Sequence, residues 1–373
     1  MKKALMYMIM AGFLQACHNP IDEMKIINQI TAPSTDVMKD FANQFEALHG
    51  TVDPQLSWMT AANAVAEVDL SDLSKEQDYY VHFYTADPRQ GLSYCFLLAE
   101  YKVKGGATHK LEYDYPIALD NVFVTAISES GISYTTRIDT REEGAGSVRF
   151  VKELAEETDL TFEPMRYRIC YEGFTGEPSL DFDFNDVVAE IEYVRGNTVA
   201  KVNVLAAGCE CASQLTYKRS TTKKDELGEV LFEEVHDALG FPGWFDHGIK
   251  QMTYPILNTG MNQTGQIGTT TLNLDEDAGK SITEIAPNLI ASFSLPSDKK
   301  GKKENITSSS IPVYKGVSYP QAILVAYPDW EWPKEYIRLS VAYSKFRLWM
   351  ANPQDYANWY GGKDWKTAND AVN

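Results

Sequence analysis

Five short segments between residues 50 and 144 are rich in aromatic and β-branched residues and are separated by Gly and Pro. Such side chains fit the pleated surface of a sheet, and no helical pattern lies between the segments. Strands at this spacing are typical of a β-sandwich. The segments are residues 79–84, 94–103, 110–115, 121–127 and 132–138. The chain is therefore predicted to be mostly β, with an N-terminal β-sandwich at residues 51–150.

The rest of the chain is predicted to form a second, larger β-rich domain at residues 151–373, sandwich-like or jelly-roll-like. Strand patterns occur at residues 165–171, 187–195 and 200–206, and residues 141–146 mark a candidate domain boundary. Near the C-terminus, apolar residues recur at helical spacing after Pro333, which suits the first turn of a helix. They are Leu339, Ala342, Tyr343, Phe346, Trp349 and Met350. We expect this stripe to form one helix packed on the second domain.

Residues 1–17 have the pattern of a bacterial lipoprotein signal. Two lysines precede an apolar stretch at residues 4–13, which is too short to span a bilayer, and Leu14-Gln15-Ala16-Cys17 follows. Residues 1–16 are then a cleaved signal peptide, and Cys17 is the predicted lipidation site and membrane anchor. Residues 17–50 are predicted to be a tether with a short helix at residues 35–48. The alternative is a buried N-terminal strand that ends in an ordinary Cys. His18, in place of a retention aspartate, favours the outer membrane.

The charge balance disfavours one class of partner. The chain has 34 Lys and Arg against 52 Asp and Glu, a net charge of −18 with His neutral. Nucleic-acid binding needs clustered basic residues, and the one dense basic run, at residues 299–303, contains no aromatic on which a base can stack. No nucleic-acid partner is therefore expected.

Four cysteines remain besides Cys17: Cys95, Cys170, Cys209 and Cys211. If the segment around Cys209 and Cys211 is extended, their Cα atoms lie roughly 6.5–7 Å apart, which is awkward for a mutual disulfide. Zinc would need further Cys or His at short spacing. We therefore expect all four to be small buried hydrophobic residues.

The most informative motif is the run DFDFND at residues 181–186. Apolar residues fall on even positions up to Phe184 and on odd positions from Val187 onward. Since a strand alternates strictly, this phase slip predicts a bulge or turn with several oxygen-bearing side chains gathered on it. Calcium takes six to eight such oxygens in irregular geometry. The predicted ligands of a calcium ion are Asp181, Asp183, Asn185 and Asp186.

Two other interpretations of this motif were weighed. An EF-hand spacing is rejected because Asp186 stands at the glycine position and an extended segment would carry Glu192 roughly 20 Å away. A turn in which the carboxylates accept backbone N–H bonds, without a metal ion, remains an open alternative.

The same run lies within an ordered set of motifs that resembles the LruC-domain family of bacterial lipoproteins and secreted proteins, over about residues 160–365. This resemblance implies a secreted or surface β-rich protein with a cation site at the acidic motif, and no established activity. Residues 50–150 resemble, more loosely, the β-sandwich that precedes this domain in Bacteroides-like lipoproteins. The motifs are RICYE (168–172), DFDFNDVV (181–188), FEEVHDALG (232–240), Met252 with LNTG (257–260), YPQAI (319–323), WEWP (330–333), Phe346 and Trp349.

Two further groups of residues were considered as sites. His236 and His247, with nearby carboxylates, have the ligand types of a zinc hydrolase but not the i, i+4 spacing of a helical zinc motif. Five of the seven Trp lie in the last 44 residues, and exposed aromatic rings can stack on sugars. Trp359 and Trp365, close to Gly361 and Gly362, are the predicted surface aromatics.

These observations predict a lipid-anchored protein of the cell envelope, in the outer membrane and displayed at the surface. Its expected role is calcium-stabilised binding or adhesion, with a polysaccharide or a surface protein as the ligand, and no catalysis. The alternatives are a purely structural envelope component without metal and a metal-dependent hydrolase that uses His236 and His247.

Overall fold

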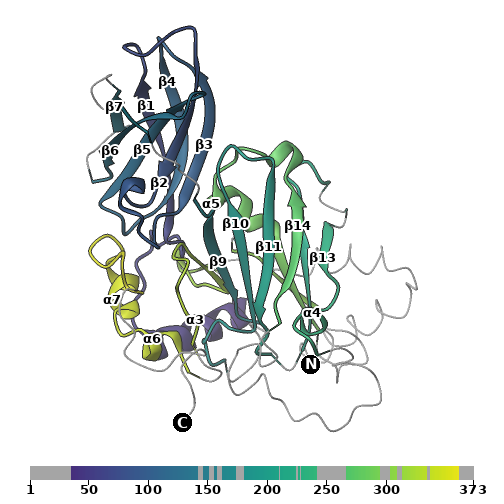
Figure 1. The fold of residues 1–373 in the computed structure, drawn as a ribbon. Coiled ribbons are helices and arrows are strands. Elements are labelled where there is room, and N and C mark those ends of the chain that lie inside the picture. Colours follow the sequence, from purple (N-terminus) through teal and green to yellow (C-terminus); the bar gives the residue numbers. More distant parts are fainter. Residues whose placement is uncertain are drawn as a thin grey trace, which may run out of the picture.

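A computed structural model describes most of the chain between Thr35 and Tyr360, and its strands far outnumber its helices (Figure 1). This confirms the predicted mostly β fold. Among the described residues, no helix is long and apolar enough to cross a membrane. The described residues are 35–141, 146–150, 155–157, 162–173, 180–209, 211–223, 226, 228–241, 266–294, 303–308, 313–333 and 337–360.

The N-terminal β-sandwich has a three-stranded sheet, in the order β4-β1-β7, and a five-stranded sheet, in the order β3-β2-β5-β6-β8. Phe83 of one sheet stacks on Tyr113 of the other, with ring centroids 4.8 Å apart. β7 pairs with β1 and β8 pairs with β6, so both strands that follow Arg141 in the described part of this region belong to this sandwich. The strands are β1 (Ala61–Asp69), β2 (Asp78–Tyr84), β3 (Leu97–Lys104), β4 (Thr108–Pro116), β5 (Asn121–Ser128), β6 (Ile132–Asp139), β7 (Gly146–Arg149) and β8 (Ala155–Glu157); a 3-10 turn, η1, covers Pro88–Gln90.

The second sandwich pairs a five-stranded sheet, β14-β11-β10-β9-β19, with a four-stranded sheet, β13-β12-β15-β16, and all its strand pairs are antiparallel. Short helices and a small hairpin of β17 and β18 complete it. The strands are β9 (Met165–Tyr171), β10 (Val187–Tyr193), β11 (Val199–Ala206), β12 (Ala212–Tyr217), β13 (Glu229–Phe232), β14 (Gly268–Asn273), β15 (Leu289–Ser294), β16 (Lys303–Ile306), β17 (Val313–Tyr314), β18 (Val317–Ser318) and β19 (Ala322–Val325). The short helices are α4 (Val235–Ala238), η3 (Asp275–Asp277), α5 (Ile282–Ile285) and η4 (Ala286–Asn288).

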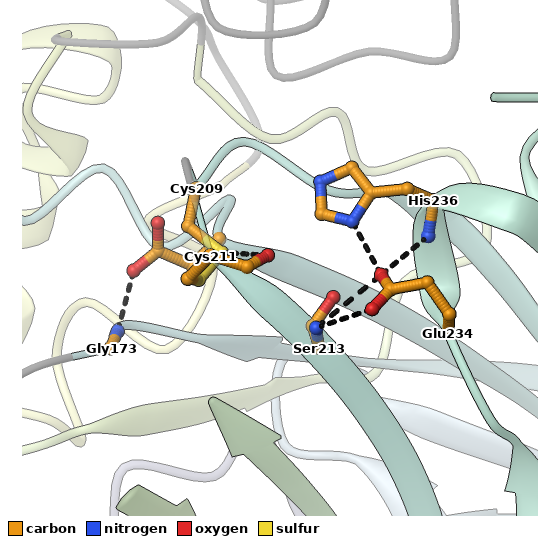
Figure 2. Close-up of a disulfide and its surroundings, with 7 residues drawn as sticks. Gly173, Cys209, Cys211, Ser213, Glu234 and His236 are labelled. Carbon is orange, nitrogen blue, oxygen red and sulfur yellow. Dashed lines mark hydrogen bonds and ion pairs between the residues drawn. A yellow bond between two sulfur atoms is a disulfide. The ribbon is translucent and has the colours of Figure 1, made fainter. Parts of the chain in front are cut away.

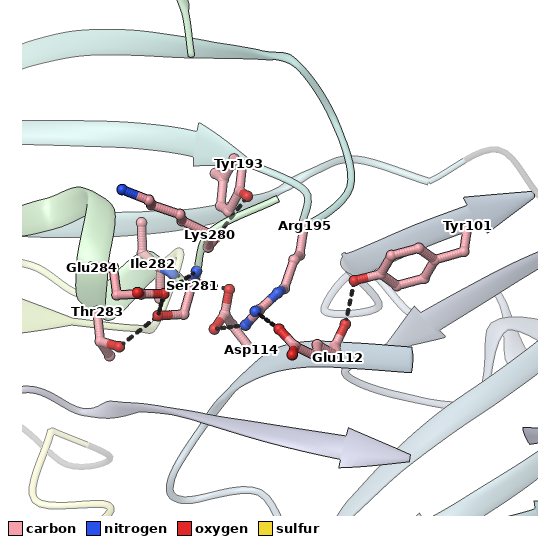
Figure 3. A network of polar contacts seen from close by, with 10 residues as sticks. All are labelled: Tyr101, Glu112, Asp114, Tyr193, Arg195, Lys280, Ser281, Ile282, Thr283 and Glu284. Atoms are coloured by element: carbon pink, nitrogen blue, oxygen red, sulfur yellow. Dashed lines mark hydrogen bonds and ion pairs between the residues drawn. The ribbon is translucent and has the colours of Figure 1, made fainter. Parts of the chain in front are cut away.

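The two sandwiches share one continuous core of buried apolar residues and are also joined by backbone bonds. Arg195, just after β10, donates its N–H to Leu98 O and accepts from Glu100 N–H, both at 2.9 Å. Its side chain reaches Asp114 of β4, with Nη1 3.3 Å from Oδ1 (Figure 3). Gly196 follows with φ +99°, and a Cβ there would lie 2.3 Å from Glu100 O, so the close approach requires glycine.

A second core covers the outer face of the β14-β11-β10-β9-β19 sheet at one end. There the sheet packs against α3 (Thr35–His49), α6 (Leu339–Ala342) and α7 (Phe346–Ala351). The predicted N-terminal helix is thus confirmed, and its apolar face packs on this end of the sheet through Phe41 and Phe45. The predicted single C-terminal helix is instead two short ones. Tyr343 leaves helical geometry, with φ −134° and ψ 94°, and both helices bury most of their apolar residues in the same core.

Candidate metal centre

The acidic loop, residues 181–186, leads directly into β10 and has the irregular backbone that the phase slip predicted. Phe182 and Phe184 have left-handed φ angles of 53° and 57°, and a register shift follows between Val188 and Ala189. Left-handed backbone is unfavourable for bulky residues and has to be held by its surroundings. Both Phe side chains are fully buried in the second core, where Phe182 packs against Phe45 of α3. Burial of the two rings therefore holds the loop in this conformation.

Glu172, the residue after β9, is the centre around which the loop is organised. It is 2% exposed, and its two carboxylate oxygens accept the N–H of Phe182 at 3.1 Å and of Phe184 at 3.0 Å. Successive N–H groups that converge in this way form an anion-binding concavity. Glu172 is not among the ligands predicted from the sequence. The available signal was an acidic residue directly after an apolar strand, within the RICYE motif.

Three carboxylates converge at this point. Glu172, Asp181 and Asp183, here called the acidic triad, each offer one oxygen, and these oxygens lie within 4.8 Å of one another. Two oxygens bound to the same calcium ion at about 2.3–2.6 Å can be separated by up to about 5 Å. The triad therefore fits a single cation of calcium size, which could be held from three sides by this protein.

Two of the four predicted ligands belong to the triad, and the other two make different contacts. Asp186 Oδ2 accepts the N–H of Gly173 at 2.5 Å, and Asn185 Nδ2 donates to Pro333 O at 3.2 Å. Asn185 Oδ1 is buried and has no hydrogen-bond partner in the described part of the chain. The structure thus groups Asp181 and Asp183 with Glu172, while Asp186 lies outside that group.

The electrostatics of the cluster favour a cation. Burial is the main cause that raises the pKa of Glu172 well above its ordinary range, followed by the charges of Asp181, Asp186 and Asp183. Burial, with the charges of Asp181 and Glu304, also raises the pKa of Asp186 to about 7, against the hydrogen bond from Gly173. Buried carboxyl groups this close together either take up protons or need a positive charge beside them.

A disulfide lies beside the acidic loop, which corrects the prediction that all four remaining cysteines are unpaired. Cys209 and Cys211 are bonded, with their Cα atoms 5.2 Å apart (Figure 2). The prediction assumed an extended segment, but the chain turns here as it passes from β11 into β12, which shortens this distance. Cys95 and Cys170 are free and buried, as predicted.

His236 is fully buried, and its Nδ1 lies 2.6 Å from Glu234 Oε1 (Figure 2). The same carboxylate accepts the N–H of His236 at 3.2 Å and of Ser213 at 3.2 Å, so Glu234 caps the start of α4. These contacts place His236 in a structural hydrogen-bond network. Its predicted partner His247 lies outside the described residues.

The prediction that Trp359 is a surface aromatic is wrong. Its side chain is 0% exposed and packs against Trp330, Phe346 and Trp349, with ring centroids 5.0–6.2 Å apart. The neighbouring Gly361 and Gly362 suggested a loop, but burying the ring in the second core removes more apolar area from water. Trp365 and the predicted lipidation site Cys17 lie outside the described residues.

Comparison with protein families, with curated proteins and with solved structures finds no match to this chain.

Proposed function

We propose that the chain is a lipid-anchored protein of the bacterial cell envelope whose second sandwich binds calcium, and that it serves in binding or adhesion at the cell surface. The observation that carries the proposal is the acidic triad, in which three carboxylate oxygens lie within 4.8 Å of one another. All its ligands are oxygens, and the loop is irregular, which favours calcium over the smaller magnesium ion with its octahedral demand.

Two observations support the location in the envelope. The first is the lipoprotein-like pattern that ends at Cys17. The second is the Cys209–Cys211 disulfide, because disulfides persist in oxidising compartments and are rare in the cytosol. The resemblance to LruC-domain lipoproteins has the same implication.

The proposed ligand is a polysaccharide or a surface protein. Trp359 and Trp365 were the two aromatic residues predicted from the sequence to contact this ligand. Because Trp359 lies in the second core, Trp365 is the one that is still proposed to contact it. The net charge of −18 suits an envelope protein that a divalent cation stabilises.

A structural envelope component without metal is the second candidate function, and one observation favours it. The two N–H groups of Phe182 and Phe184 already donate to Glu172, as expected of a hydrogen-bonded turn. In that case protonation would remove part of the negative charge of these carboxyl groups, and calcium would have no effect on the stability of the protein.

Calcium titration by calorimetry, with thermal melting in calcium, magnesium and chelator, tests the proposal. We expect calcium to release or absorb heat and to raise Tm by several degrees, because a ligand at about 100 times its Kd stabilises by roughly 2.7 kcal/mol. Asp183→Asn should remove this response. Glu192→Gln changes an acidic residue of β10 outside the triad and should keep it. A wild-type protein that melts at the same temperature in calcium and in chelator would support the metal-free alternative.

A further inference from the structure

The Cys209–Cys211 disulfide closes a ring across a single residue, at the corner where the chain leaves β11 and enters β12 in the opposite sheet. In the chain-entropy account, the stabilisation from a disulfide grows with the length of the loop it closes. A ring this small adds little to the stability of the whole fold by that route. Its main physical effect is to restrain the corner itself.

This corner is bonded to the acidic loop. Gly208, directly before Cys209, donates its N–H to Asn185 O at 2.9 Å, and Asn185 stands between Asp183 and Asp186 in the loop. One step further, Val188 of β10 pairs with Ala206 of β11. The end of β11 therefore runs alongside the acidic loop up to the disulfide.

A second contact joins the acidic loop to the segment that carries Glu172. Gly173, labelled in Figure 2, donates its N–H to Asp186 Oδ2 at 2.5 Å. Gly173 directly follows Glu172 of the triad. The residue before the disulfide is thus bonded to the acidic loop, and the acidic loop is bonded in turn to the segment that carries Glu172.

We propose that the thiol–disulfide state of Cys209 and Cys211 regulates the cation affinity of the acidic triad. This inference rests on the proposed function, because it assumes that the triad binds calcium. With the disulfide closed, Gly208 is fixed and the loop is held ready for the cation. With the disulfide open, the corner gains freedom that calcium binding must remove, and the affinity falls.

The switch is a two-electron exchange with a dithiol reductant. Cys209 is the more exposed of the pair, at 8% against 1% for Cys211, so the first thiolate of the reductant attacks Cys209 Sγ. The Sγ–Sγ bond breaks and Cys211 leaves as a thiolate, which takes a proton. The second thiol of the reductant then loses its proton and attacks the reductant's first sulfur, which is bonded to Cys209 Sγ in the mixed disulfide. This releases Cys209 as a thiolate, which takes a proton. The protein gains two electrons and two protons, and the reductant becomes a disulfide.

Linkage requires the coupling to work in both directions. If closing the disulfide strengthens calcium binding by some factor, saturating calcium must favour the closed disulfide by the same factor. The thiol–disulfide equilibrium of Cys209 and Cys211 therefore shifts toward the disulfide when calcium is added.

Calcium affinity is measured by calorimetry on the mature chain, oxidised and after reduction with a dithiol. We expect the reduced protein to bind calcium about fivefold to tenfold more weakly. In a dithiol redox buffer, calcium should lower the reduction potential, and a tenfold coupling corresponds to about 30 mV. The variant Cys209→Ala/Cys211→Ala should bind like the reduced protein and ignore the reductant. Cys95→Ala, which removes a buried free cysteine of the first sandwich, should behave like wild type.

Equal calcium affinities of the oxidised and reduced proteins would overturn this inference and leave the proposed function standing. An oxidised protein that binds no calcium would overturn both. If the double variant does not fold, the reduction potential of Cys209 and Cys211 in the wild-type protein, measured in chelator and in calcium, still tests the inference. A reduction potential that calcium leaves unchanged contradicts the coupling.

Discussion

Two of the places where the described chain buries acidic side chains treat their charge in opposite ways. At the junction of the sandwiches, Asp114 is fully buried and faces the guanidinium of Arg195, while the N–H of Ile282 donates to its other oxygen at 3.0 Å. At the acidic loop, Glu172 is equally buried, and the charged groups that raise its pKa are the carboxylates Asp181, Asp186 and Asp183. The first site carries its own cation, and the second concentrates negative charge.

This difference separates a structural role from a binding role. A buried carboxylate is tolerated in a fold when a partner compensates it. Arg195 belongs to the second sandwich and Asp114 to the first, so their pairing joins the two. In the proposed function, a calcium ion from solution compensates the negative charge of the acidic triad. The stability of this site therefore depends on the calcium concentration.

The largest expected effect is at the junction. Arg195→Ala leaves Asp114 buried without its guanidinium, and loss of one partner of a buried pair costs about 3–5 kcal/mol of the free energy of unfolding. Urea denaturation in saturating calcium measures this loss. Asp114→Asn in the same chain should recover part of it, because the uncompensated charge is then gone.

The matched control is Lys201→Ala, which breaks the pair of Lys201 Nζ with Glu192 Oε1 at 2.8 Å on β10 and β11. Lys201 is about half exposed, and surface pairs contribute roughly 0–1 kcal/mol. If Arg195→Ala cost no more than this control, the pairing would not be what joins the sandwiches.

The second prediction concerns pH and separates the two sites directly. The pKa of Asp186 is raised to about 7, and that of Glu172 is raised as well, so in chelator their contribution to stability is greatest below about pH 4 and is lost as the pH rises toward 7. Calcium binds the ionised carboxylates of the triad, Glu172 among them, and its charge also favours the ionised form of the neighbouring Asp186, so calcium offsets this loss. The stabilisation by calcium should therefore be about 1–3 kcal/mol larger at pH 8 than at pH 5.

The measurement is the difference in unfolding free energy with calcium and with chelator at each pH. Burial raises the pKa of Asp114 to about 7 too, but that contribution is present in both solutions and cancels in the difference. A calcium effect that is the same at pH 5 and pH 8 would contradict a cation bound by the acidic triad.

Much of the fold could be predicted from local patterns. The five strands predicted from aromatic and β-branched residues correspond to β2–β6. β1 was not selected, since its sequence AANAVAEVD is rich in Ala and acidic residues, which are poor strand formers, and pairing with β4 along its whole length holds it in the sheet. Long-range pairing of this kind leaves no local signal.

The candidate site was predictable only in part, for the same reason. The phase slip located the loop, because strict alternation is a local rule. It could not show that Glu172, just after β9, completes the triad, nor that a turn brings Cys209 and Cys211 into bonding distance. The prediction for Trp359 was wrong because Trp330 and two residues of α7, Phe346 and Trp349, create the core that buries it.

The smallest expected effect tests whether Asp186, which was predicted from the sequence as a ligand, or Glu172, which the structure groups with Asp181 and Asp183, binds the ion. Asp186→Asn should keep calcium binding, because Asp186 lies outside the triad and the Asn oxygen can still accept the N–H of Gly173. In chelator at pH 8, the variant should be about 1 kcal/mol more stable than wild type, since it removes a half-buried carboxyl whose pKa is raised. Urea denaturation in chelator and calorimetry with calcium measure the two effects. Loss of calcium binding in Asp186→Asn, with binding retained in Glu172→Gln, would instead assign the ion to the ligand set predicted from the sequence, with Asp186 in place of Glu172.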